Sequence, residues 1–157
     1  MDILNLGAGN RPVQPVDGGI VVNHDLMLDQ ARPFVTVAHD LNIIPWPWPD
    51  ASFDLIVACA VLEHLRRNLA ESLAECWRIL RPAGILYVKL PYWKSENSYT
   101  DATHYWVFGL SIFEQFDPDT ERGREYVFYG WPQWKIVQAA KLNDAKTSFA
   151  AKLQVRK

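Results

Sequence analysis

An apolar strand that leads directly into a glycine turn is the feature that most constrains how this chain folds. Residues 2–6 are predicted to form a strand, and Gly7-Ala8-Gly9 follows at once. Glycine has no Cβ, so its backbone adopts positive φ and a ligand can lie directly against it. In open α/β sheets, nucleotide-like ligands bind at the carboxyl ends of parallel strands. The stretch Leu4–Asn10 therefore indicates a nucleotide-binding α/β domain, although a purely steric role for the glycines stays open.

Length and composition fit a single domain over residues 1–157. The net charge is −2, which gives no electrostatic argument for a nucleic-acid partner. Cys59 and Cys76 lack the spacing of a redox or zinc motif and indicate a reducing compartment. We find neither a signal-peptide pattern nor an apolar run of the roughly 18–20 residues that a membrane span needs. We therefore expect a cytoplasmic protein without a membrane partner.

The hydrophobic pattern predicts strands that alternate with connecting segments. The expected strands are residues 2–6, 20–24, 34–38, 53–60, 85–90, 134–142 and 148–155. Such alternation is typical of a parallel sheet, because a parallel pair needs a crossover connection. The last two strands are expected to form an antiparallel pair at the edge. The predicted fold class is therefore α/β, with a mostly parallel sheet.

One helix is predicted over residues 68–80. Its apolar residues recur on one face, and Asn68 with Glu71 forms a capping-box pattern at its start. Pro82 and Gly84 are expected to end it.

Three other segments are expected to contribute little regular structure. No full helix fits residues 10–19, because proline removes a helical hydrogen bond and clashes with the preceding turn. Residues 111–116 are expected to form a short helix, and residues 117–125 a polar loop. The first crossover of the sheet is thus predicted to be minimal.

Asp25 is the first candidate binding residue outside the glycine turn. It lies at the end of the second predicted strand, 18 residues after Gly7. In nucleotide-binding α/β folds, an acidic side chain about 20 residues beyond the turn accepts hydrogen bonds from ribose hydroxyls. A solvated aspartate at a strand end is the simpler alternative.

Five sequence blocks resemble the class I S-adenosylmethionine (SAM)-dependent methyltransferases, in particular the type 11 group of small-molecule methyltransferases. The blocks are Leu4–Asn10; Val22–Asp25; His39–Leu41 with Pro49–Asp54; Val61–His64 with Glu75–Gly84; and Asp101–Phe108. They follow the family's order across residues 3–116. The resemblance implies a Rossmann-like class I methyltransferase sheet with a C-terminal antiparallel hairpin. Two helices of the family pattern, before the first strand and after the glycine turn, are missing, so reduced helices and a more open site are expected.

The resemblance implies S-adenosyl-L-methionine as the cofactor. The residues expected to contact it are Asn5, Gly7, Ala8, Gly9, Asn10, Asp25, Asp40, Leu41 and Ala60. By position, the glycine turn would line the methionine part and Asp25 would hold the ribose hydroxyls. Asp40 would accept from the adenine amino group, with Leu41 nearby, and Ala60 would close over the ligand.

Catalysis of methyl transfer needs positioning above all, because the methyl group on a sulfonium is already a good electrophile. A hydroxyl acceptor also needs a base, and His104 is the best candidate because imidazole titrates near neutral pH. Asp101 is expected to orient it, although the pair could instead only hold the loop in place. The aromatic residues expected to contact the substrate are Tyr92, Trp93, Tyr99 and Trp106.

The predicted function is SAM-dependent methylation of a small-molecule or sugar-containing acceptor. The alternative is a non-catalytic SAM-binding partner subunit or a degenerate methyltransferase, acting in a homodimer or with a partner protein. A nicotinamide-binding domain is disfavoured, because Asn10-Arg11-Pro12 stands where its third glycine would open a helix. No metal site is expected, because Cys59 and His64 alone do not make a ligand set.

Overall fold

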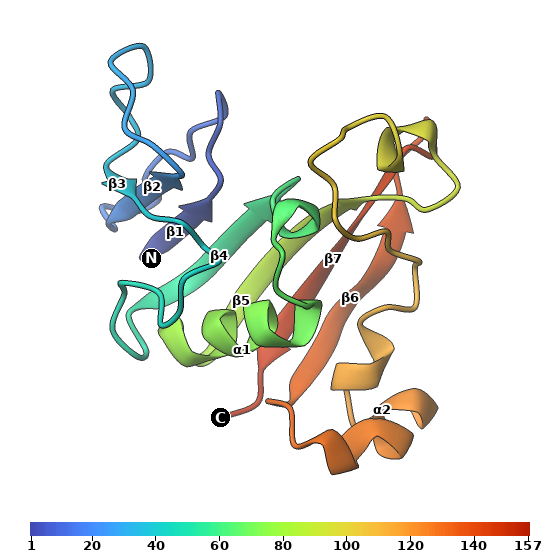
Figure 1. The fold of residues 1–157 in the computed structure, drawn as a ribbon. Coiled ribbons are helices and arrows are strands. Elements are labelled where there is room, and N and C mark those ends of the chain that lie inside the picture. Colours follow the sequence, from blue (N-terminus) through green and yellow to red (C-terminus); the bar gives the residue numbers. More distant parts are fainter.

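Seven strands form one sheet in the computed structural model, which describes residues 1–157 (Figure 1). The strands are β1 (Ile3–Leu6), β2 (Val21–Asp25), β3 (Val37–Ala38), β4 (Phe53–Cys59), β5 (Leu80–Pro91), β6 (Trp134–Leu142) and β7 (Ser148–Val155). The α-helices are α1 (Leu69–Ile79) and α2 (Glu121–Tyr126). Short 3-10 helices lie at Leu62–His64, Glu96–Ser98, Glu114–Phe116 and Val127–Tyr129. No helix combines the length and the apolar character that a membrane crossing requires.

The strand order is β3-β2-β1-β4-β5-β7-β6, and the first five strands run parallel. β7 pairs antiparallel with both β5 and β6, which places the C-terminal hairpin at the edge of the sheet. The expected mostly parallel sheet with a C-terminal antiparallel hairpin is thereby confirmed. The chain order reverses between β1 and β4, and the carboxyl ends of these two strands are where a ligand is expected to bind.

The helix α1 begins as the sequence predicted. Asn68 accepts a hydrogen bond from the Glu71 amide at 3.0 Å, and the Glu71 carboxylate accepts one from the Asn68 amide at 3.2 Å. The helix ends at Ile79, and the chain enters β5 directly at Leu80. The predicted start of this strand at residue 85 is wrong, because Leu80 already pairs with Phe53 ahead of an irregularity in the ladder.

Other predicted segments also differ from the structure. Residues 34–36 are not part of β3, because only His24 and Asp25 of β2 lie opposite this strand. Within residues 111–116, only Glu114–Phe116 is helical. Residues 117–125 are not simply a loop, since Thr120 caps α2 by accepting a hydrogen bond from the Gly123 amide at 2.9 Å.

The two faces of the central strands differ. Ile56 and Ala58 of β4, like Leu86 and Val88 of β5, are buried on the face that α1 covers (Figure 1). Their neighbours along each strand are only half-buried. Parallel sheets usually carry helices on both faces. The opposite face here has no helix after β1, as the prolines and glycines of residues 10–19 predicted.

The proline-rich loop before β4 is anchored to α1. The Trp46 amide donates to the Glu75 carboxylate at 2.6 Å, and Arg78 donates to the carbonyl oxygens of Trp46 and Trp48 at 3.1 and 2.9 Å. The buried Trp46 indole also donates to the Leu41 carbonyl oxygen at 3.0 Å. These bonds fix the segment that carries Asp40, at the carboxyl edge of the sheet.

Candidate cofactor site

The glycine turn after β1 needs its glycines for two different reasons. Gly7 and Gly9 have φ of 59° and 52°, a region that residues with a Cβ rarely adopt. A Cβ on Gly7 would also lie 2.7 Å from a methyl carbon of Val61. The turn is thus both left-handed and tightly packed.

The His24 side chain links this turn to the segment after β3 through two hydrogen bonds. The Gly7 amide donates to His24 Nδ1 at 3.4 Å, and His24 Nε2 lies 2.9 Å from the His39 carbonyl oxygen. An amide can only donate and a carbonyl can only accept, so the proton of the neutral ring is on Nε2. Burial lowers the pKa of His24 and favours this neutral form.

The Asp25 carboxylate joins the glycine turn to the end of β2. Its Oδ2 accepts hydrogen bonds from the Gly9 amide at 2.9 Å and from Arg32 at 2.6 Å, and its Oδ1 accepts one from the Leu26 amide at 2.7 Å. A carboxylate has about four lone-pair sites. One site on Oδ1 therefore remains for another donor.

Asp40 presents a free oxygen to the same region. Its Oδ1 accepts from the backbone and side-chain nitrogens of Asn42 at 2.9 and 2.8 Å, whereas no donor within the chain bonds its Oδ2. The Asn42 amide, more than any other group, holds the pKa of Asp40 below its ordinary value, so the carboxylate is an acceptor at neutral pH.

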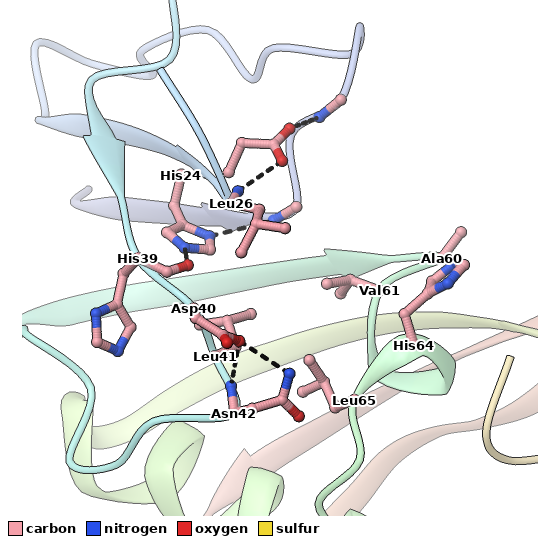
Figure 2. Close-up of a pocket in the computed structure, with 13 residues that line it drawn as sticks. His24, Leu26, His39, Asp40, Leu41, Asn42, Ala60, Val61, His64 and Leu65 are labelled. Atoms are coloured by element: carbon pink, nitrogen blue, oxygen red, sulfur yellow. Dashed lines mark hydrogen bonds between the residues drawn. The ribbon is translucent and has the colours of Figure 1, made fainter. Parts of the chain in front are cut away.

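These residues line a cavity of about 280 Å³ (Figure 2). Its walls are Gly7, Gly9, His24, Asp25, Leu26, His39, Asp40, Leu41, Asn42, Ala60, Val61, His64 and Leu65. Figure 2 shows the β2–β3 side of the cavity facing Ala60, Val61 and His64 across the opening. Six of the nine residues predicted to contact the cofactor lie here: Gly7, Gly9, Asp25, Asp40, Leu41 and Ala60.

A second, larger hollow of about 670 Å³ also borders the glycine turn. It is lined by Asn5, Gly7, Ala8, Gly9, Asn10, Arg11, Val13, Val57, Cys59, Ala60, Tyr87 and Lys89. The remaining predicted residues, Asn5, Ala8 and Asn10, are in this group. The sequence analysis did not predict Arg11 or Lys89 as site residues. The signal for Arg11 was its position two residues after Gly9.

Asn5 and Ala60 shape the hollow. The Asn5 side-chain amide donates to the Arg11 carbonyl oxygen at 3.0 Å and to Asn23 at 2.9 Å, so it fixes the loop that replaces a helix. Ala60 borders both hollows and has φ of 54°. Such strained residues cost about 1–3 kcal/mol and cluster at ligand sites.

The predicted catalytic pair lies beside the first cavity rather than inside it. His104 Nε2 is 3.9 Å from Asp101 Oδ2, longer than a hydrogen bond. The other oxygen of Asp101 accepts from Thr103 Oγ1 at 2.6 Å, and Thr103 Oγ1 lies 2.8 Å from His64 Nδ1. Asp101 therefore orients His64 through Thr103.

Glu63 is a group that sequence reasoning missed. Its side chain is fully buried, and burial raises its pKa to about 7. The only signal was its place in the Leu-Glu-His run before α1.

The four aromatic residues predicted to contact substrate line neither hollow. The Trp106 indole donates to the Leu65 carbonyl oxygen at 2.8 Å, and the Tyr99 hydroxyl donates to the Trp93 carbonyl oxygen at 2.9 Å. Tyr92 packs against Trp93 and the core. Trp93, Tyr99 and Trp106 are nevertheless exposed, on the segment after β5.

The strand order and the glycine turn at the reversal of that order define a Rossmann-like α/β fold. A family model described as a methyltransferase domain matches residues 18–88. A protein of Mycolicibacterium smegmatis, described as a probable S-adenosylmethionine-dependent methyltransferase, is 42% identical over 59 residues. This match covers 38% of this chain and 22% of that protein, so the chain spans about a fifth of its curated relative.

Solved structures show the same fold. A SAM-dependent methyltransferase from Archaeoglobus fulgidus superposes with a TM-score of 0.61 and 17% identity, covering 98% of this chain and 85% of that one. A chain from the complex of the Haloferax volcanii Trm112 methyltransferase activator with a candidate methyltransferase gives a TM-score of 0.65 and 14% identity, over 99% and 83%. The family model, the curated relative and the shared fold together confirm the predicted resemblance to the class I SAM-dependent methyltransferases.

Proposed function

We propose that this protein binds S-adenosylmethionine and transfers its methyl group to a small-molecule or sugar-containing acceptor. The observation that carries the proposal is a glycine turn bordered by two hollows, one with two carboxylates and one with two cations. SAM matches both hollows. Its adenosine carries hydroxyl and amino groups that can donate to the two carboxylates, and its methionine part ends in a carboxylate that suits the two cations. Both the matching methyltransferase-domain model and the solved SAM-dependent relatives support this assignment.

The adenosine half is assigned to the 280 Å³ cavity. The vacant lone pair on Asp25 Oδ1 suits one ribose hydroxyl, and the unbonded Asp40 Oδ2 suits the adenine amino group. Leu41 and Ala60 supply apolar contacts for the base and the sugar. Each carboxylate then gains a donor without losing one that it already has.

The methionine half is assigned to the 670 Å³ hollow beside Gly7, Ala8 and Gly9. In most class I methyltransferases, a helix N-terminus lies near the ligand carboxylate, and that helix is missing here. Arg11 and Lys89 line the hollow and supply two positive charges instead. Both also act on Cys59, whose pKa burial raises and these two cations lower.

Methyl transfer itself is an in-line displacement, in which the acceptor atom attacks the methyl carbon as the C–S bond breaks. Holding the reactants in line supplies most of the rate enhancement, up to about 7–11 kcal/mol of the barrier. His104, with Asp101 nearby, remains the proposed base for a hydroxyl acceptor. Trp93, Tyr99 and Trp106 are the proposed acceptor contacts, because they are exposed on the same segment.

Calorimetric titration with S-adenosylhomocysteine, the expected reaction product, tests the cofactor assignment, with NADH as the control. Micromolar binding of S-adenosylhomocysteine alone is the expected result. Absence of binding by the full chain would contradict the proposal and would return the glycine turn to a steric role.

The alternative is a SAM-binding subunit that acts with a protein partner or as a homodimer. The half-buried sheet face without a helix favours it, as does the Haloferax relative, whose complex contains a methyltransferase activator. Light scattering of the purified chain decides between a monomer and a dimer. Retained SAM binding without methyl transfer across a broad acceptor panel would favour this alternative over an enzyme.

A further inference from the structure

Glu63 is a buried carboxyl group that lacks any partner within the chain. Its relative exposure is 0%, and neither side-chain oxygen makes a hydrogen bond. An unpaired buried carboxylate costs several kcal/mol, so buried acidic groups in proteins are paired, protonated or bound to a metal.

Two imidazoles lie next to this carboxyl group. His64 follows it in the chain, and His104 comes from the segment after β5; their ring centroids are 4.6 Å apart, edge to face. One ligand atom from each of Glu63, His64 and His104 lies within 4.8 Å of the other two. In a tetrahedral zinc site with bonds of about 2.0–2.1 Å, the ligand atoms are roughly 3.3 Å apart. Small side-chain rotations therefore bring these three atoms onto one ion.

Hydrogen bonds prepare both rings for metal binding. Thr103 Oγ1 donates its one proton to Asp101, so it must accept from His64 Nδ1, 2.8 Å away. His104 Nδ1 lies 3.4 Å from the Ser98 carbonyl oxygen, which can only accept. Each ring is left with an unprotonated Nε2, the form that binds metals. In metal sites, the histidine nitrogen that does not bind the ion usually donates a hydrogen bond that fixes the orientation of the ring.

We propose that Glu63, His64 and His104 bind a divalent first-row transition-metal ion, with zinc as the reference ion. Two imidazoles with one carboxylate favour such ions over magnesium and calcium, which prefer oxygen ligands throughout. Three protein ligands leave at least one coordination position for water or a substrate.

The metal site adjoins the assigned cofactor cavity, because His64 belongs to both. With an ion bound, His104 Nε2 is a ligand and no longer a base. The ion itself is then suited to hold the oxygen of a methyl acceptor and to lower the pKa of its hydroxyl group. This role rests on the proposed function, whereas metal binding itself does not.

The test is titration of the EDTA-treated, tag-free full chain with Co²⁺, followed by its visible absorption, and then displacement by Zn²⁺. We expect one ion per chain, no displacement by Mg²⁺, and a higher melting temperature with Zn²⁺. Glu63→Gln and His104→Gln are expected to lose more than 100-fold in affinity. Thr103→Val, which removes the hydroxyl that links His64 to Asp101 and leaves the three proposed ligands in place, is expected to lose about 10–100-fold.

His39→Gln is the matched control, because it removes another histidine of the same cavity that lies outside the cluster. It is expected to bind Co²⁺ as the unmodified chain does. Failure of the unmodified chain to bind either ion would overturn the proposal. So would an affinity of Glu63→Gln and His104→Gln for Co²⁺ equal to that of the unmodified chain. If circular dichroism shows that Glu63→Gln does not fold, His104→Gln and Thr103→Val test the proposal instead, because His104 is half-buried and Thr103 is exposed. Binding of S-adenosylhomocysteine, measured separately, reports on the proposed function alone.

Discussion

The carboxylate of Asp25 accepts a hydrogen bond from the backbone amide of Gly9 at 2.9 Å. This bond ties the end of β2 to the glycine turn after β1, although 16 residues separate the two groups in the chain. The glycine turn and the acidic residue that the sequence placed 18 residues after Gly7 therefore form one structural unit. A ligand in the cavity meets both at once.

The first prediction follows from this unit. Asp25→Ala is expected to weaken S-adenosylhomocysteine binding about 10–100-fold, because hydrogen bonds to charged groups contribute about 1.5–3 kcal/mol. The variant is expected to stay folded, since the Gly9 amide is only partly buried. Calorimetry measures the affinity, and circular dichroism reports the fold.

Asp29→Ala is the control for Asp25, because the exposed Asp29 bonds the same Arg32 at 3.3 Å. It is expected to keep the affinity of the unmodified chain. Unchanged affinity in Asp25→Ala would remove this carboxylate from the site.

The second prediction concerns the packing of Gly7. Gly7→Ala is expected to lower the free energy of unfolding by roughly 2–4 kcal/mol, because it adds a left-handed alanine and a contact of 2.7 Å with Val61. Gly18→Ala is the comparison, since Gly18 also has positive φ but nothing lies within 4 Å of its added Cβ. Urea denaturation that gives the same loss for both variants would refute the packing argument.

The third prediction is a pH dependence that His24 confers. Its pKa in the folded chain is below the ordinary value of 6.5, chiefly because of burial. The unfolded chain therefore takes up a proton first, so the stabilisation by neutral His24 is complete above about pH 6.5 and is lost as the pH falls through the folded-state pKa.

His24→Gln isolates this contribution from that of the other titrating groups. Urea denaturation from pH 7.5 to 5 is expected to show a steeper loss of stability for the unmodified chain than for the variant. Each unit of pKa difference corresponds to about 1.4 kcal/mol. Parallel curves for the two proteins would show that His24 is not the group responsible.

The fourth prediction tests the start of α1. Asn68→Ala is expected to cost about 1 kcal/mol, because it removes the acceptor for the Glu71 amide. Asn68→Asp keeps a capping oxygen and is expected to unfold close to the unmodified chain. A melting temperature for Asn68→Ala equal to that of Asn68→Asp would argue against the cap.

The sequence by itself determined the features that depend on neighbours along the chain. Strand periodicity predicted β6 and β7 with their observed bounds, and Asn68 with Glu71 predicted the start of α1. The prolines of residues 10–19 predicted the missing helix. Local patterns are sufficient here, because backbone conformation and strand burial follow from residues that are close in sequence.

Only the tertiary structure decided which distant groups meet. His104 lies beside Glu63 and His64 because the segment after β5 returns over the end of β4, with the Tyr105 amide bonded to the Glu63 carbonyl oxygen at 2.8 Å. Lys89 lines the same hollow as the glycine turn only because β5 lies next to β4. Strand pairing and chain crossovers set these distances, and no periodicity within one segment encodes them.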